Sequence, residues 1–187
     1  MPPSTSQAIL LVDGYNVVGS WHSLKQIRDR YGLEEARREL VANLAGYSAY
    51  QNFETHLVFD AQYQDAPSSR EMASGNVWIC YTDYRQTADT YIERSCALFR
   101  KDIRKFDHRL IVATSDRAQQ LTVVGYGAEW ISAEQLKIEV DLVNLRVRNQ
   151  KQTFKKGRSP KRFLSHTIDP VARQRLAKLL LGQDFKE

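Results

Sequence analysis

Cysteine is scarce in this sequence of 187 residues, which contains only Cys80 and Cys96. Neither belongs to a C-x-x-C motif and both lie in apolar surroundings, so a disulfide scaffold or a structural zinc cluster is not expected. No run approaches the ~18 apolar residues of a membrane span, and residues 1–7 lack the basic and apolar regions of a signal peptide. These absences predict a cytoplasmic protein with no membrane partner and a flexible N-terminus over residues 1–7.

Several motifs of known chemistry are also missing. The sequence contains neither the GxxxxGK[ST] phosphate loop nor the GxSxG nucleophile elbow. Its four histidines are scattered without the spacing of metal ligands. A P-loop nucleotide site, a serine hydrolase and a histidine-based metal site are therefore not expected.

Acidic residues are absent from one segment of the chain. Residues 146–162, the basic strip, hold eight Lys and Arg and no Asp or Glu, whereas residues 1–145 hold 15 basic and 19 acidic residues. The formal charge of +5 therefore combines a mildly acidic domain with a basic strip, and a uniformly basic, histone-like surface is excluded. Gly157, Pro160 and the lack of periodicity predict an exposed loop or flexible arm over residues 150–163.

Short apolar runs alternate with longer helical patterns along the rest of the chain. This alternation predicts an α/β fold with a mostly parallel central sheet of about five strands and helices on both faces. The predicted domain covers residues 8–145, and residues 146–187 form a basic arm followed by a C-terminal helix. The expected strands are 8–13, 55–60, 77–81, 110–114 and 128–131, and the expected helices are 33–50, 88–105, 117–124, 132–144 and 171–181.

Carboxylates follow three of the predicted strands. Asp13 and Asp60 end two strands, Asp116 lies just beyond a third, and Asp89 and Glu93 share one face near the start of the helix at 88–105. Because parallel strands end at one edge of a sheet, these carboxylates are expected to meet in one cleft. Such a cluster is repulsive unless a cation neutralises it, and its oxygen ligands suit Mg²⁺ or Mn²⁺.

Each of these carboxylates also has a purely structural interpretation. Asp13 would form a turn with Gly14, Asp60 would begin a loop, and Asp116 would cap the following helix. Glu93 would complete a capping box with Thr90. Taken singly these interpretations are about as good as the functional ones, but all of them must hold together to remove the cluster.

Four sequence blocks carry a resemblance to a known family. Residues 10–19 (LLVDGYNVVG), 58–61 (VFDA), 81–94 (YTDYRQTADTYIER) and 114–120 (TSDRAQQ) resemble the YacP-like branch of the NYN domain family in order and spacing. This resemblance covers about residues 8–145 and implies a PIN-like nuclease fold, a three-layer sandwich. It also implies divalent-metal-dependent cleavage of RNA, with ribosome-bound mRNA as the substrate in bacterial relatives.

The resemblance also assigns roles within the cluster. Asp13, Asp89 and Asp116 would hold one or two Mg²⁺ or Mn²⁺ ions, with Asp60 and Glu93 lining the site. The catalytic set is completed by Asn16, which would orient a water, a phosphate oxygen or the Asp13 carboxylate.

Basic and aromatic residues near the blocks are candidates for contact with RNA. Tyr15 and Trp21 have the chemistry to stack on unpaired bases, although packing in the core or a lid is the favoured role for both. The arginines that flank the motif loops have the alternative of being solvated helix charges, and the basic residues of the arm that of a solvated loop. The predicted RNA-contacting set is Tyr15, Arg85, Arg94, Arg117, Lys155, Lys156, Arg158, Lys161 and Arg162.

Two other functions remain open from the sequence. One is an RNA- or ribosome-binding module without turnover, and the other is a metal-dependent phosphatase acting on a small phosphate ester. The retained carboxylates argue against the first, since a binding module has no physical need for repelling charges. The basic strip argues against the second, since a small substrate needs no extended positive surface.

Overall fold

The structure, a computed structural model, describes residues 8–60 and 69–157, with side chains described as far as residue 150. Its contacts divide the chain into two compact units, Met1–Leu145 and Arg146–Glu187. The predicted flexible N-terminus and the predicted C-terminal helix lie outside the described residues. Within those residues, no helix is long and apolar enough to cross a membrane.

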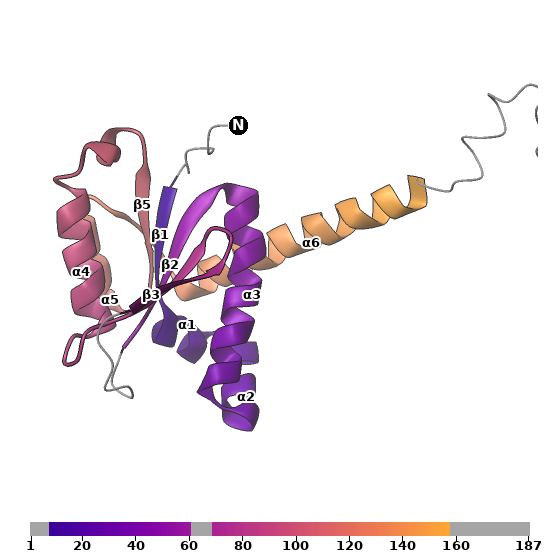
Figure 1. Cartoon of the computed structure of the whole chain (residues 1–187), viewed down its shortest axis with the longest axis horizontal. Helices are drawn as coiled ribbons and strands as arrows, with labels where there is room; N and C mark the ends of the chain where they lie inside the picture. The colour runs from indigo at the N-terminus through magenta and orange to yellow at the C-terminus, as the bar shows by residue number, and fades with distance from the viewer. Residues whose placement is uncertain (1–7, 61–68, 158–187) are drawn as a thin grey trace, which may run out of the picture. The chain divides into compact units, whose positions relative to one another are not determined.

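A central sheet of six strands organises the first unit, in the order β3-β4-β2-β1-β5-β6 (Figure 1). Neighbouring strands run parallel except β3, which pairs antiparallel with β4 at one edge. The mixed α/β fold with a mostly parallel sheet is therefore confirmed. The strands are β1 (Ala8–Asp13), β2 (Phe53–Phe59), β3 (Ser69–Ser74), β4 (Val77–Tyr81), β5 (Arg109–Ala113) and β6 (Glu129–Ile131).

Helices cover both faces of this sheet, with α4 and α5 on one side and α3 on the other (Figure 1). The Tyr47 hydroxyl on α3 donates to Glu139 Oε2 at 2.6 Å and so ties the first part of α6 to the α3 layer. The chain thus forms the expected three layers. The helices are α1 (Gly14–Ser20), α2 (His22–Tyr31), α3 (Leu33–Gln51), α4 (Ala88–Phe99), α5 (Arg117–Gly125) and α6 (Ala133–Gly157), with the 3₁₀ turn η1 (Ile103–Phe106) between α4 and β5.

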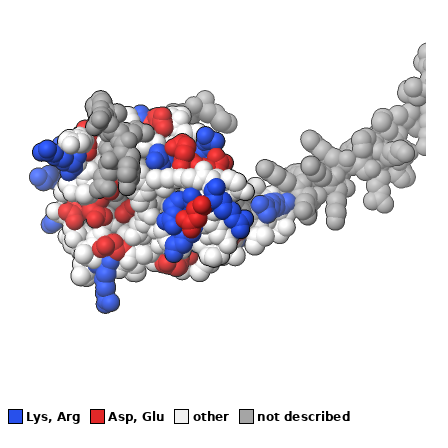
Figure 2. All heavy atoms as spheres, turned by 90° about the horizontal axis from the view of Figure 1, so that it is seen from below, with Lys and Arg blue, Asp and Glu red and all other residues white. Residues whose placement is uncertain are grey.

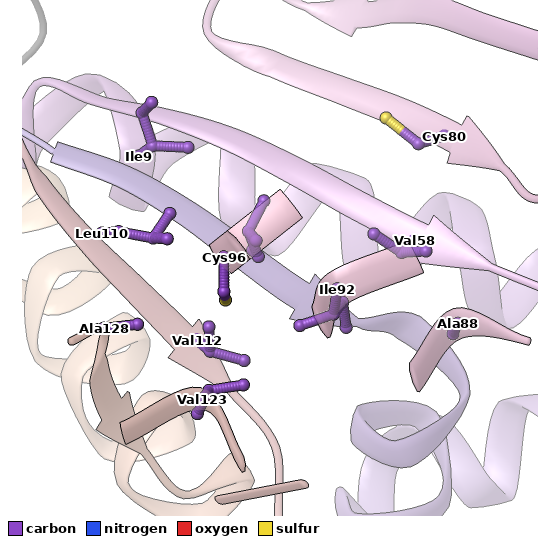
Figure 3. Close-up of a cluster of buried hydrophobic side chains, with 11 residues drawn as sticks. Ile9, Val58, Cys80, Ala88, Ile92, Cys96, Leu110, Val112, Val123 and Ala128 are labelled. Atoms are coloured by element: carbon purple, nitrogen blue, oxygen red, sulfur yellow. The ribbon is translucent and has the colours of Figure 1, made fainter. Parts of the chain in front are cut away.

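An apolar layer between the sheet and α4 and α5 buries the side chains on one face of the strands (Figure 3). Ile9 and Leu11 of β1 point into this layer, in keeping with the two-residue period of a strand. Cys80 and Cys96 are buried in the same layer as free thiols, and burial raises the pKa of Cys96 to about 12. Both cysteines are therefore core residues and not reactive groups.

Three elements and the ends of two helices differ from the sequence prediction: α4 ends at Phe99 and not at residue 105, and α6 continues beyond residue 144. Helices α1 and α2 and the edge strand β3 had no predicted counterpart. All six residues of β3 are exposed, so burial imposes no alternating pattern on its sequence. The predicted loop at residues 150–163 is wrong for residues 150–157, because α6 continues into the basic strip as far as Gly157. Lys, Arg and Gln are good helix formers even without an apolar face.

Candidate active site at the carboxyl edge of the sheet

Three carboxylates lie where parallel strands end. Asp13 is the last residue of β1. The residue before it, Val12, pairs with Leu57 of β2 and with Ala113 of β5. Asp60 immediately follows β2, and Asp116 lies three residues beyond β5. The structure therefore places all three at one edge of the sheet, as the spacing in the sequence predicts.

This edge is formed at the lower ends of the strands in Figure 1, beside α1. Figure 2 views the molecule from below and shows a group of acidic side chains on the part of the surface nearest α4 and α5, with basic side chains at its margin. The surface beneath α2, by contrast, carries mixed basic and acidic side chains. The acidic face is thus local and does not extend over the whole underside.

Asp13 is the most buried of these carboxylates, with 8% of its surface exposed. Its side chain caps α1 by accepting a hydrogen bond from the backbone N–H of Asn16 at 3.0 Å. Burial raises the pKa of Asp13 from 3.8 to about 6; the Asn16 hydrogen bond opposes this rise, whereas the charges of Asp89 and Asp60 add to it. A carboxylate held in this way gains from any cation that approaches it.

Gly14 allows the chain to turn directly from β1 into α1. A Cβ atom at this position would overlap the ring of Phe59 at the end of β2. The close approach of β2 therefore requires glycine at position 14, and this is why a glycine directly follows Asp13.

Asp60 connects the end of β2 to the start of α4. Its Oδ1 accepts a hydrogen bond from the backbone N–H of Ala88, so it satisfies one of the free N–H groups of that helix. Asp89 follows in the first turn of the same helix. The contact accounts for the proximity of these two carboxylates, although 28 residues separate Asp60 from Ala88.

Asp89 is exposed and has three acidic neighbours. Partial burial and the charges of Asp116, Asp60 and Glu93 raise its pKa, and a hydrogen bond from Gln119 opposes the rise. These couplings bring all the carboxylates predicted for the site into one electrostatic group. The helix at 88–105 was predicted correctly at its start, and the cap is Thr87, which accepts a hydrogen bond from the N–H of Thr90. Glu93 is thus coupled to the site, and the Thr90 capping box is not observed.

Asp116 caps α5, accepting hydrogen bonds from the N–H groups of Ala118 at 2.8 Å and Gln119 at 3.0 Å. The structural interpretation of this residue is therefore realised, and its proximity to Asp89 is realised as well. Capping engages one carboxylate oxygen, Oδ1, in both hydrogen bonds. The other oxygen accepts no hydrogen bond from a described residue.

Asn16 connects β1 to the loop after β5. Besides the backbone contact with Asp13, its side-chain Oδ1 accepts a hydrogen bond from the N–H of Ser115 at 2.8 Å. The Ser115 hydroxyl in turn donates to Glu134 at 3.0 Å and accepts from the N–H of Ala133 at 3.1 Å. The backbone N–H of Asn16 thus contacts the Asp13 carboxylate, one of the targets predicted for this residue, and its side chain holds the loop that carries Asp116, which was not predicted.

Sequence reasoning missed Gln119, which links two of the carboxylates. Its backbone N–H donates to Asp116 and its side-chain amide donates to Asp89 Oδ1. The side chain is buried, with 3% exposed, and its Oε1 atom accepts no hydrogen bond from a described residue. The block TSDRAQQ contained this residue, but nothing in its spacing indicated a contact with the separate helix that holds Asp89.

Arg37 of α3 was also missed, and it determines how Tyr15 is packed. Its guanidinium lies 5.4–6.0 Å from the ring centroids of Tyr15, Phe59 and Tyr81. The Arg37 Nη2 atom is 3.5 Å from the Tyr15 hydroxyl, and the Tyr15 ring packs edge-on to Phe59. Tyr15 is therefore half-buried beside the site, and stacking of Tyr15 on RNA remains a prediction.

The structure describes most, but not all, of the other candidates for contact with RNA. Trp21 is buried and donates from Nε1 to the carbonyl of Ala133 at 2.7 Å, so it packs and does not present a face to RNA. Arg94 and Arg117 are exposed on α4 and α5. Arg85 is exposed in the loop before α4, has a positive φ of 68°, and lies 5.3 Å from the Tyr84 ring. Lys155 and Lys156 belong to the last turn of α6, and Arg158, Lys161 and Arg162 lie outside the described residues.

The charges of the cluster are held only by neutral donors. Within the described part of the chain, none of Asp13, Asp60, Asp89 and Asp116 forms a salt bridge, and their hydrogen bonds come from backbone N–H groups and one amide. No three His, Cys, Asp or Glu side chains among these residues are already arranged around one metal position. The donor chemistry nevertheless fits Mg²⁺, which keeps several waters and is bound through one or two carboxylates.

Comparison with known proteins identifies the family. The model of the YacP-like NYN domain matches residues 10–180. The chain belongs to the YacP-like NYN domain family. NYN domains are PIN-like nuclease-type domains, so the carboxyl edge lies in a fold associated with nuclease chemistry. The match extends beyond residue 145, where the sequence resemblance was expected to end.

Members of the YacP group from Bacillus subtilis are similar to this chain in sequence and in structure. The protein YacP of strain 168, described as uncharacterized, is 33% identical over 139 residues, covering 74% of this chain and 78% of that protein. A crystal structure of a mutant of Rae1 (YacP) is 29% identical, with a TM-score of 0.68 over 92% of this chain and 99% of that one. A second Rae1 (YacP) structure is 27% identical, with a TM-score of 0.65 over 92% of this chain and 90% of that one.

Proposed function

We propose that this YacP-like NYN protein is a divalent-metal-dependent endoribonuclease. The observation that carries the proposal is the group of carboxylates at the carboxyl edge of the sheet, which repel one another and have no cationic partner among the described residues. A carboxylate cluster with only structural roles gains stability from neighbouring Lys or Arg. In this chain the negative charge of the cluster is instead left available to a cation.

In this proposal Asp13, Asp89 and Asp116 hold one or two Mg²⁺ or Mn²⁺ ions, with Asp60 and Glu93 adding negative charge at the margin. The metal would lower the pKa of a bound water and stabilise charge on the phosphate during in-line displacement. Asp13 is held in place by the start of α1, and Asp116 by the start of α5. These fixed positions reduce the reorganisation that catalysis requires.

Asn16 and Gln119 act in the proposal as positioning residues. Asn16 fixes the loop after β5 relative to β1, and Gln119 fixes Asp89 relative to Asp116. Both hold carboxylates through neutral hydrogen bonds and so leave the negative charge for the cation. Such outer contacts orient metal ligands and raise affinity for the metal.

The proposed substrate is RNA, with mRNA on the ribosome as the specific form and the cytoplasm as the location. The acidic edge repels phosphates, so positive charge elsewhere must attract the substrate. The basic strip at residues 146–162 supplies eight positive charges without an acid. In this proposal Lys155, Lys156, Arg158, Lys161 and Arg162 bind RNA phosphates, and Arg85, Arg94 and Arg117 also contact the RNA backbone.

The test is cleavage of single-stranded RNA and of mRNA on translating ribosomes. The full chain is incubated with Mn²⁺ or Mg²⁺, with EDTA, and as the Asp13→Asn variant, and internal cuts are mapped on sequencing gels. Asp29→Asn is the matched control, because Asp29 is exposed on α2 and pairs with Arg28. The expected result is internal cleavage that EDTA and Asp13→Asn abolish and Asp29→Asn retains. RNA binding without metal-dependent cuts would instead identify a binding module.

A further inference from the structure

A second positively charged region lies at the edge of the sheet opposite the carboxylates. Residues 100–109 connect α4 to β5 and contain five Lys and Arg against two Asp, in a unit that is acidic overall. Arg109 pairs with Ala8 at the start of β1, whereas Asp13 ends that strand. A five-residue strand such as β5 spans about 16 Å, so this region is separated from the carboxylate cluster by the length of the sheet.

The same segment exposes large apolar side chains. Ile103 and Phe106 of η1 are 79% and 77% exposed, more than any other large apolar side chain described. A single exposed apolar residue needs no explanation, but two on one short turn beside basic residues form a patch. Packing within the described part of the chain does not account for them.

A hollow of about 440 Å³ lies beside η1. This volume falls within the range of small-ligand sites, roughly 300–1,000 Å³. Three aromatic rings and several basic side chains form much of its wall. These lining residues include Phe99, Phe106, Tyr126, Arg100, Lys105 and His108.

The contacts in this region distinguish structural from available cations. Arg104 is held by Asp102 at 2.8 Å, and Arg109 is held by Glu129. Arg100 and Lys101 are exposed and form no salt bridge with a described residue. Arg104 and Arg109 therefore have structural roles, whereas Arg100 and Lys101 are available to bind phosphates.

Lys105 completes the arrangement. Its ammonium lies 5.0 Å from the centroid of the Phe106 ring and donates to the carbonyl of Arg100 at 3.1 Å. A cation over one face of an exposed ring suits an unpaired nucleotide, with the base on the other face of the ring and the phosphate on the cation. An acidic peptide would satisfy the charges but would leave the exposed aromatic faces without a planar partner.

We propose that the η1 surface, formed by Phe99, Arg100, Lys101, Lys105, Phe106 and Tyr126, binds single-stranded RNA. An unpaired base stacks on Phe106, and Arg100, Lys101 and Lys105 bind the neighbouring phosphates. The choice of RNA rests on the proposed function, whereas the surface itself rests on exposure, charge and shape. Because it lies away from the carboxylates, the surface contributes to RNA affinity and not to bond cleavage.

The experiment measures binding of the full chain to a fluorescein-labelled oligouridylate by anisotropy, in EDTA so that no cleavage occurs. Phe106→Ala is expected to weaken binding about fivefold or more, which corresponds to at least ~1 kcal/mol of stacking. Phe106→Trp should retain the wild-type affinity. Leu121→Ala is the matched control, because Leu121 is 74% exposed on α5 and lies outside the surface.

A charge test complements the ring test. The double variant Arg100→Gln, Lys101→Gln should reduce the slope of log affinity against log salt by about 1.4, and Arg30→Gln on α2 should not. The proposal would be overturned if both η1 variants kept the RNA affinity and the salt slope of the wild type. It would also be overturned if poly-L-glutamate competed with RNA for the wild-type chain, and Phe106→Ala abolished this competition without changing the affinity for RNA. A failure of the proposed nuclease function would give a different result. The η1 variants would still bind RNA more weakly than the wild type, but the wild-type chain would make no metal-dependent cuts.

Discussion

Asp13→Asn is expected to stabilise the folded chain at neutral pH, because it removes a buried charge. Burial and the nearby carboxylates raise the pKa of Asp13 from 3.8 to about 6. Each pKa unit corresponds to about 1.36 kcal/mol, so the ionised side chain lowers the free energy of unfolding by about 3 kcal/mol at about pH 7.5. Asparagine has nearly the same size and also caps helices well, so the start of α1 should be retained.

The sign of the pH dependence follows from the higher pKa in the folded state. Between pH 3.8 and about 6 the folded chain binds more protons at Asp13 than the unfolded chain does. The contribution of this residue to the free energy of unfolding therefore falls as the pH rises through that window. The stabilisation by Asp13→Asn should shrink from about 3 kcal/mol at about pH 7.5 to about 1 kcal/mol at about pH 4.5.

The assay is urea denaturation followed by circular dichroism at both pH values, with EDTA present to remove divalent cations. Asp29→Asn serves as control, since Asp29 is exposed and its ion pair with Arg28 is on the surface. That variant should change the free energy of unfolding by no more than about 0.5 kcal/mol at either pH. An Asp13→Asn variant that is less stable than the wild type, or equally stabilised at both pH values, would refute the reasoning.

Three further outcomes are expected. Gly14→Ala should destabilise the chain by about 1–3 kcal/mol in urea denaturation, because its Cβ would overlap the phenyl ring at the end of β2; Gly19→Ala, which meets nothing within 4 Å, should not. Gln119→Leu should raise the Mn²⁺ concentration for half-maximal RNA cleavage about tenfold or more, and equal effects of Gln119→Leu and Gln120→Leu would contradict the positioning role. Mn²⁺ should raise the melting temperature of the wild type in differential scanning fluorimetry, and a similar rise in Asp13→Asn would show that the ion binds elsewhere.

The parallel part of the sheet could be predicted because burial on both faces leaves a clear pattern. Residues 8–13 and 77–81 are apolar runs whose bounds agree with β1 and β4. The edge strand β3 could not be predicted, because it is exposed along its whole length. It is held in the sheet by its pairing with β4 and not by burial of its side chains. The continuation of α6 to Gly157 was missed for a related reason, since its basic residues supply helix propensity without an apolar periodicity.

The carboxylates of the site could be predicted because the topology of a parallel sheet alone brings strand ends together. Asp13, Asp60 and Asp116 needed only the correct strands and their direction. Gln119 could not be predicted in the same way, since its contact with Asp89 depends on how α4 and α5 pack against each other. The same holds for Arg37, whose three aromatic neighbours come from β2, β4 and the start of α1.

Neutral donors give the carboxylate edge a property that salt bridges would remove. Backbone N–H groups at the starts of α1, α4 and α5 fix Asp13, Asp60 and Asp116 in position, but they carry no full charge to cancel that of the carboxylates. Burial of Asp13, with the repulsion from Asp89 and Asp60 added to it, raises the pKa of this residue and destabilises the chain near neutral pH. A bound cation would relieve this repulsion, so the charges that weaken the fold without metal are the ones that give the proposed metal site its affinity. The stabilisation expected for Asp13→Asn and the loss of cleavage expected for the same variant are therefore two consequences of one arrangement.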